Sequence, residues 1–458
     1  MVFSRLRVLV PVLLLALTAC GAVPAPSPSL SPPSSSTDAS PAAGGSPRPG
    51  DVVPAPGSES ELYRPNPKAI TVAIDPGHGG CLDWGVPDPS ERGPAYAEKA
   101  MTLGIGLALQ RLLVAQGINV VMTRSSDVAL AGDNYPDLNC NGPAWRDVDG
   151  DGQAGFEESG RIRTRDELQA RIDVANVARA DVLVSIHINS PTENGVPVAI
   201  AFSETFYDDE TPWGVARTEK LATLVQSGVS AAFDGVGYEH QDRGIDAKAF
   251  YIIARQWASG DTCQTPDDTW CSPHRGLQTP GVLSEVGSIS LADEQDLLLT
   301  DRGQQSVAEG IEQGLAQYFS DRPLSVRYDA LVPGGDAGVV PAAAPGDGAP
   351  YLVPDLPAET TRLPIRLTNN GSQAWPAGLE LRAGWQASDA PYLASAPDLH
   401  ALEVAVPPLQ PGESVEVSVD PGSSPAADRA LLWISLANGT KLLSEAGSPA
   451  LQLARAAH

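Results

Sequence analysis

From about residue 68 onward, hydrophobic and polar residues follow two patterns in turn, one typical of β-strands and one typical of α-helices. Short apolar runs occur in "AITVAID", "INVVMTR" and "DVLVSIHINS", and they predict strands. Between them, "EKAMTLGIGLALQRLLVAQG" and "DELQARIDVANVARA" space their apolar residues three and four apart, as one face of a helix requires. Because the strands are apolar on both faces, the pattern predicts an α/β fold with a mixed, mostly parallel sheet and helices on both faces.

The same alternation continues to about residue 322 and then changes. "WGVARTEKLATLVQSGVSAAF" and "GQQSVAEGIEQGLAQYF" predict helices, and "AFYIIAR" and "GVLSEVGSIS" predict strands. Residues 323–355 are rich in Gly, Pro and Ala and predict a linker. The short alternating runs "RLPIRLTNN", "LELRAGWQ", "LEVAVPPL", "ESVEVSVD" and "ALLWISLANG" then predict a C-terminal all-β sandwich domain at 356–458.

The N-terminal segment has the layout of a secretory signal. Arg5 and Arg7 precede an apolar run that is too short to span a membrane comfortably. "LTAC" at residues 17–20 resembles a lipobox, so residues 1–19 are expected to be removed and Cys20 to carry a lipid. The alternative is an ordinary signal peptide. Residues 20–67 have almost no large apolar side chain and predict a disordered tether. The signal and Cys20 predict an extracytoplasmic, membrane-anchored lipoprotein.

Charge and cysteine content narrow the classes of partner. The 458-residue chain has a formal charge of -26, which excludes nucleic acid as a partner, since binding phosphates needs a basic surface. Four further cysteines favour disulfides in an exported protein, with Cys263 to Cys271 and Cys81 to Cys140 as one possible pairing. His274 lies beside this cysteine pair, and we expect it to be structural.

Four side chains fall at or beside the predicted strand ends and could do chemistry. His78 follows the first strand in "DPGHGG", His187 ends the third, and Glu98 opens the first helix. Two imidazoles and one carboxylate make a ligand set known from catalytic zinc sites. Glu285, at another strand, would supply a general base and acid. From these residues alone, three interpretations of His78 stay open: it is a metal ligand, it lies in an anion-binding loop, or it lies in a turn without a functional role.

Residues 70–320 resemble the zinc-dependent N-acetylmuramoyl-L-alanine amidases of the amidase 3 type. The resemblance is carried by the unchanged "DPGHGG", the Glu-Lys start and "TR" end of "EKAMTLGIGLALQRLLVAQGINVVMTR", the pattern in "RIDVANVARADVLVSIHINS", and "PGVLSEVGSIS". It implies a phosphorylase/hydrolase-like catalytic domain at 68–322. Two segments, residues 129–163 and 255–277, are insertions relative to this family, and Leu291 stands where the family commonly has asparagine.

Carried over residue by residue, the resemblance implies a zinc amidase acting in cell-wall turnover or division. His78, Glu98 and His187 would bind Zn²⁺, and Glu285 would transfer protons. The family cleaves the amide between the lactyl group of N-acetylmuramic acid and L-alanine in peptidoglycan. Asn189 and Arg243 match family positions and are expected to contact the substrate. The glycines around His78 are expected to let the loop backbone, and a bulky glycan, approach the metal closely.

The first insertion contains "DVDGDGQAGFEE", which fits the spacing of a calcium-binding loop. Four carboxylates and one backbone carbonyl would bind Ca²⁺, because such crowded carboxylates repel one another unless a cation neutralises them. The alternative is a solvated acidic turn. The candidate ligands are Asp147, Asp149, Asp151, Gln153 and Glu158.

The C-terminal runs resemble Ig-like domains of bacterial surface proteins. Trp375, Trp385 and Trp433 are expected in its core, and an exposed binding strip is the alternative. The competing function for the whole chain is a non-catalytic wall-binding lipoprotein with an amidase-like fold. A third possibility is hydrolysis of another bond of the wall peptide. The sequence does not identify an activating protein partner.

Overall fold

The computed structural model describes residues 52–53, 66–81, 83–131, 146–150, 165–193, 196–255, 275–322, 324–331, 352–357 and 360–456. All of these fall within one compact unit, Ser46–His458. The predicted signal peptide, lipidation site Cys20 and most of the tether lie outside the described residues. Among the helices of these ranges, none has the length and apolarity that crossing a bilayer requires.

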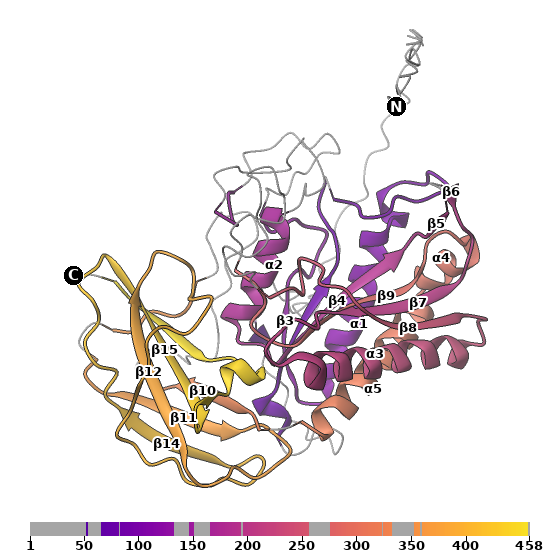
Figure 1. The fold of residues 1–458 in the computed structure, drawn as a ribbon. Helices are drawn as coiled ribbons and strands as arrows, with labels where there is room; N and C mark the ends of the chain where they lie inside the picture. The colour runs from indigo at the N-terminus through magenta and orange to yellow at the C-terminus, as the bar shows by residue number, and fades with distance from the viewer. Residues whose placement is uncertain are drawn as a thin grey trace, which may run out of the picture. The chain divides into compact units, whose positions relative to one another are not determined.

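A seven-stranded sheet forms the centre of the N-terminal domain (Figure 1), in the order β1-β3-β2-β4-β9-β7-β8. The central strands β3, β2, β4 and β9 are parallel. β1 is antiparallel to β3 and β7 is antiparallel to β9, whereas β8 is parallel to β7. The predicted mixed, mostly parallel sheet is confirmed. The strands are β1 Val52–Val53, β2 Thr71–Pro76, β3 Asn119–Met122, β4 Val182–Asn189, β7 Phe202–Tyr207, β8 Gln241–Ala247 and β9 Gly281–Ser288.

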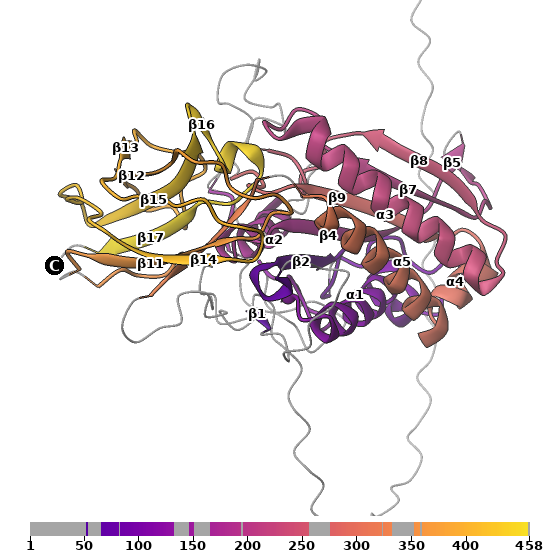
Figure 2. The same cartoon turned by 90° about the horizontal axis from the view of Figure 1, so that it is seen from below.

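Helices cover both faces of this sheet, as predicted. On one face, α1 Glu98–Ala115, α3 Gly214–Val236 and α5 Asp301–Ser320 bury a continuous apolar core against the strands (Figure 2). The other face carries α2 Arg165–Val177. Gly117, with a φ of 85°, follows the C-cap residue Gln116 of α1 and takes the left-handed conformation that terminates helices. The short helix α4 Ala292–Leu298 and the two-stranded β5 Thr192–Glu193 and β6 Val196–Pro197 complete the domain.

The strand predicted at "AFYIIAR", residues 249–255, is wrong. The strand in this region is β8, and residues 248–255 form turns closed by hydrogen bonds from Ile253 N and Ala254 N to Phe250 O. The segment is apolar because Ile252 and Ile253 are buried in the core on the α2 side of the sheet. The apolar residues of this segment pack against the sheet, but the segment is not one of its strands.

The C-terminal domain consists of two antiparallel sheets around a shared apolar core. One sheet has the order β10-β11-β14, and the other is built from β13, β12, β15, β16 and β17. A two-sheet sandwich is therefore confirmed, and its Ig-like relationship stays a prediction. The strands are β10 Val326–Ala330, β11 Leu363–Asn369, β12 Leu379–Ala387, β13 His400–Ala401, β14 Ser414–Val419, β15 Arg429–Asn438, β16 Lys441–Leu442 and β17 Leu451–Ala456.

Two details of the sandwich differ from expectation. β10 lies inside the range predicted as a linker, because its five residues pair with β11. The run "LEVAVPPL" contributes no strand beyond β13, which ends at Ala401 just before it, and its two prolines lack the N–H groups that a ladder needs. Trp375 and Trp433 are buried, as predicted, whereas Trp385 is half-buried against the core.

The sandwich is joined to α2 by a buried polar contact. The Tyr392 hydroxyl donates to Asp173 Oδ1 at 2.7 Å and accepts from Asn176 Nδ2 at 2.9 Å. Trp433 and Leu431 of β15 belong to the same apolar core as the buried face of α2. The side of the sheet that carries α2 is thus completed by residues of the C-terminal domain.

Candidate active site

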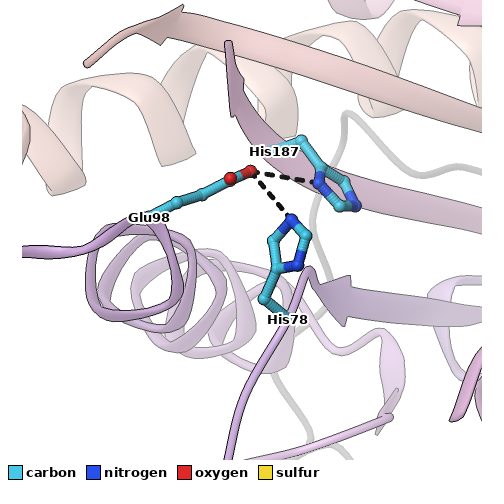
Figure 3. Close-up of side chains that lie close together, drawn as sticks. All are labelled: His78, Glu98 and His187. Atoms are coloured by element: carbon cyan, nitrogen blue, oxygen red, sulfur yellow. Dashed lines mark hydrogen bonds and ion pairs between the residues drawn. The ribbon is translucent and has the colours of Figure 1, made fainter. Parts of the chain in front are cut away.

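Three elements converge on one point at the carboxyl edge of the parallel strands (Figure 3). His78 lies in the loop after β2, His187 lies near the end of β4, and Glu98 is the first residue of α1. Parallel neighbouring strands end at the same edge, so β2 and β4 deliver both imidazoles to one place. The structure brings together the three residues predicted as zinc ligands.

One carboxylate oxygen faces both imidazoles. Glu98 Oε1 lies 3.2 Å from His78 Nε2 and 3.1 Å from His187 Nδ1, and the two rings are 4.7 Å apart at 82°. Backbone N–H groups fix the carboxylate: Ile188 donates to Oε1 and Val86 to Oε2, each at 2.8 Å. Burial opposes its ionisation, but the two histidines outweigh burial and lower the pKa of Glu98.

Asp83 orients the His78 ring from its other side. His78 Nδ1 donates to Asp83 Oδ1 at 2.7 Å, so Nε2 is directed at Glu98. Burial favours the neutral ring, but Glu98 and Asp83 together raise the pKa of His78 to about 10. Asp83 was not predicted from the sequence, although a carboxylate five residues after a candidate ligand in the same loop was a usable signal.

Two buried arginines hold the loop that carries His78. Arg124 donates to the carbonyl oxygens of Pro76 and Gly77 at 2.8 and 2.9 Å. Arg171 of α2 donates to the His78 carbonyl at 2.7 Å and pairs with Asp75 at 2.7 Å. His78 itself has a φ of 62°, an unfavourable conformation for a residue with a side chain, which these hydrogen bonds maintain.

The glycines near His78 make room for protein atoms. A Cβ on Gly77 would approach the His187 ring at 2.4 Å, and one on Gly85 would lie 2.4 Å from Glu98 Oε2. The expected clearance for a glycan is therefore not their role at these two positions. Glycine is required because imidazole and carboxylate groups pack directly against the backbone.

The three side chains fit a zinc ion. Their donor atoms lie within 4.8 Å of one another. Ligands about 2.0–2.2 Å from a tetrahedral Zn²⁺ would be about 3.4 Å apart, close to the two separations from Glu98 Oε1. Because Nδ1 of His78 donates its proton to Asp83, Nε2 is the ring nitrogen that could bind a metal, which is the usual arrangement of a zinc-binding histidine.

Glu285 lies on β9 directly beside His187 of β4. Burial, reinforced by the negative charge of Glu98, raises the pKa of Glu285 to about 8. Its Oε2 atom is buried and has no hydrogen-bond partner among the described residues. A buried carboxyl with a raised pKa and one uncommitted oxygen can accept and return a proton near neutral pH.

A cavity of about 840 Å³ opens over these residues. His78, Glu98, His187 and Glu285 line it together with Asn189. The other predicted substrate contact, Arg243, is not part of this lining, and its guanidinium lies 3.6 Å from the centre of the Phe202 ring. Residues 248–252 also line the cavity, and the last four of these belong to the segment 249–255 that was predicted as a strand.

The remaining predicted residues are only partly within the described ranges. Cys81 is disulfide-bonded, and Cys140, Cys263, Cys271 and His274 lie outside those ranges. Asp147 and Asp149 group with Asp166, with carboxylate oxygens within 4.8 Å of one another. Asp166 was not predicted as a ligand. Three predicted calcium ligands lie outside the described residues: Asp151, Gln153 and Glu158.

Fold and site together define a hydrolase whose His-Glu-His set could hold a metal ion. The chain belongs to the Amidase_3 family of N-acetylmuramoyl-L-alanine amidases, whose model matches residues 72–317. The germination-specific N-acetylmuramoyl-L-alanine amidase of Bacillus subtilis (strain 168) is 25% identical over 252 residues, covering 55% of this chain and 80% of that protein. The sporulation-specific amidase of the same organism is 26% identical over 258 residues, covering 56% and 71%.

Solved amidase structures also align with the chain. The N-acetylmuramoyl-L-alanine amidase from Clostridium difficile 630 has 26% sequence identity and a TM-score of 0.37, covering 54% of this chain and 96% of that one. The family model ends at residue 317 and so does not include the C-terminal sandwich. The matched range contains His78, Glu98, His187 and Glu285.

Proposed function

We propose that this protein hydrolyses the amide between the lactyl group of N-acetylmuramic acid and L-alanine in peptidoglycan. The observation that carries the proposal is the convergence of His78, Glu98 and His187 beside Glu285 in a chain of the amidase family. The alternative of a wall-binding protein without catalysis would require no carboxyl of raised pKa next to a metal-binding set.

We further propose that His78 Nε2, His187 Nδ1 and one oxygen of Glu98 hold Zn²⁺. When bound, Zn²⁺ would polarise the scissile carbonyl and acidify the attacking water. Asp83 keeps the proton of His78 on Nδ1, and Val86 N and Ile188 N keep the Glu98 oxygens directed at the two imidazoles.

Glu285 is the proton-transfer group of this proposal. Its Oε2 accepts a proton from the attacking water and returns it to the departing nitrogen of L-alanine. Burial supports both steps, because it weakens ionisation enough for the protonated form to exist near neutral pH. Asn189 at the rim of the cavity is available to orient the substrate by hydrogen bonds.

The proposal is tested by incubating purified peptidoglycan with the zinc-loaded protein and with Glu285→Gln. We expect new L-alanine amino termini from the unmodified protein and at least a hundredfold slower release from the variant. Glu309→Gln, an exposed position on α5, is the matched control and should retain full activity. New termini elsewhere in the peptide, or none at all, would refute the proposed activity.

Two further sites are proposed from the sequence, a lipid attachment site at the N-terminus and a calcium site in the acidic loop. We propose a lipid on Cys20 that anchors the protein to a membrane at an extracytoplasmic site, and mass spectrometry of the mature N-terminus tests it. The acidic residues of the first insertion would bind Ca²⁺. Calorimetric titration of calcium into the zinc-loaded protein should release heat, and a flat titration would contradict the calcium site.

A further inference from the structure

The lining of the cavity combines polar and apolar residues. His78, Glu98, His187 and Glu285 are its polar groups at the site of the proposed reaction. Leu168 of α2 and residues 249–252 add apolar surface. Apolar surface in the same cavity as the reacting groups suits a small apolar side chain such as that of L-alanine, which begins the peptide leaving group of the proposed reaction.

Two permanently cationic side chains line the cavity among the described residues, Arg171 and Lys248. Arg171 is fully engaged. Its guanidinium donates to the carboxylates of Asp75 and Glu167 and to the carbonyl oxygens of Pro76 and His78. Arg171 therefore has no direction left in which to bind a ligand anion.

Lys248 differs because its ammonium has no carboxylate within ion-pair distance in the part of the chain that the structure describes. Nζ lies 4.4 Å from the centre of the Phe250 ring and 5.5 Å from that of Phe206. The backbone N of Lys248 is fixed by Tyr207 O at 2.9 Å. Aromatic faces attract the cation without using its three N–H donors, so these stay available to an anion.

A lysine without a contact ion pair is unexpected in a chain with a formal charge of -26. Acidic groups greatly outnumber basic ones. Even so, among the described residues the carboxylates that interact with the charge of Lys248, Glu204 and Glu285, do so without a contact ion pair. Its charge also acts on the active site, since it lowers the pKa of Glu285 while Glu204 raises it. The ammonium and the proton-transfer group thus share one cavity.

The chemistry of the proposed substrate limits where an anionic group can come from. The lactyl carboxyl is consumed in the scissile amide, so a glycan of N-acetylated sugars carries no free carboxylate. Every carboxylate of the substrate belongs to the peptide. A cation in the cavity consequently meets the peptide side of the bond rather than the glycan side.

We propose that Lys248 binds the free α-carboxylate of the residue that follows L-alanine in the peptide. This inference rests on the proposed amidase function and adds a substrate preference to it. The enzyme prefers peptidoglycan whose second peptide residue is a free acid over peptidoglycan in which that group is amidated. The charge-assisted hydrogen bond disappears when the carboxylate becomes a neutral carboxamide.

The test compares two muramyl tripeptides that differ in one group, the α-carboxylate of the D-glutamyl second residue, free in one and a carboxamide in the other. For the zinc-loaded enzyme we expect KM for the acid to be about tenfold lower than for the amide. Lys248→Met should remove this difference by raising KM for the acid alone. Lys248→Arg should keep most of it.

Lys441→Met, an exposed lysine on β16, is the matched control and should change neither KM. A change in the pKa of Glu285 would alter kcat for both substrates alike, so the ratio of the two KM values isolates the carboxylate contact. Equal KM values for acid and amide, or an equal rise of both in Lys248→Met, would overturn this inference alone. Failure of the unmodified enzyme to cleave either tripeptide would instead refute the proposed function.

Discussion

At the scale of single residues, the site depends on where protons and charges are held. Glu98 Oε1 faces both histidines, and Asp83 fixes the ring of His78. Glu285 and Glu204 are direct cross-strand partners on β9 and β7, so their carboxyls share one face of the sheet. In the proposed mechanism, these contacts give each side chain a separate role in binding the metal, orienting a ligand or transferring a proton.

Replacing Asp83 by Asn should weaken zinc binding about 10- to 100-fold, because a neutral amide oxygen is a weaker acceptor than a carboxylate for the proton on Nδ1 of His78. Competition with a chromophoric chelator measures the affinity directly, without relying on activity. Asp296→Asn, at an exposed aspartate remote from the His78 ring, is the control. Unchanged zinc affinity in Asp83→Asn would contradict the orienting role.

Replacing Glu204 by Gln should move the acid limb of the pH–rate profile to lower pH. Glu285 acts as a base only when it is ionised, so kcat/KM rises as the pH passes through its pKa. Glu204 raises that pKa, and removal of its negative charge lowers it. A limb that stays in place, or moves to higher pH, would contradict this coupling, and Glu309→Gln again serves as the control.

At the scale of elements, α2 links the metal-binding loop to the rest of the fold. Its Arg171 reaches the His78 carbonyl and Asp75, and two residues later Asp173 receives hydrogen bonds from Arg275 and Tyr392. The strands supply the ligands, and this helix fixes the backbone that presents one of them. Because α2 is buried along nearly its whole length, small displacements of it reach the loop.

Arg171→Leu should reduce the free energy of unfolding by about 3–5 kcal/mol, since it leaves the carboxylates of Asp75 and Glu167 buried without their partner. Urea denaturation followed by circular dichroism measures the loss. The exposed pair of Arg366 with Glu416 gives the control, for which Arg366→Leu should cost less than about 1 kcal/mol. Equal losses in the two variants would contradict a structural role for the buried pair.

At the scale of the whole molecule, the sandwich and the amidase domain share a core. Trp433 and Leu431 pack in the same apolar cluster as the inner face of α2. Tyr392 is 1% exposed and bonds to Asp173 and Asn176. A domain that completes the core of its neighbour stabilises it, whatever further part it takes in binding to the wall.

Tyr392→Phe should lower the free energy of unfolding by about 1–3 kcal/mol, because Asp173 and Asn176 lose a buried hydrogen-bond partner. Differential scanning calorimetry should record one cooperative transition for both domains in the unmodified protein. Tyr96→Phe, at a tyrosine that is 38% exposed, is the control and should have little effect. Two separate transitions in the unmodified protein would argue against a shared core.

The sequence by itself determined the local structure and the identity of the donor groups. The apolar spacing that predicts α1, α2, β2, β4 and β9 is a property of short runs of neighbouring residues. Because neighbouring parallel strands end at the same edge of a sheet, His78 and His187 could be expected to lie together. Glu98 was assigned through the family motif. These features depend on short segments, which is why they were predictable.

Only the tertiary structure decided which distant groups meet. The cross-strand pairing of Glu204 with Glu285, the cavity wall at 248–252 and the uncommitted ammonium of Lys248 follow from register and from the path of turns, which no local pattern encodes. The contact of Tyr392 with α2 joins residues 219 positions apart. The motifs identified the amidase family, whereas the substrate preference proposed here and the hydrogen bonds that support the site depend on packing between remote segments.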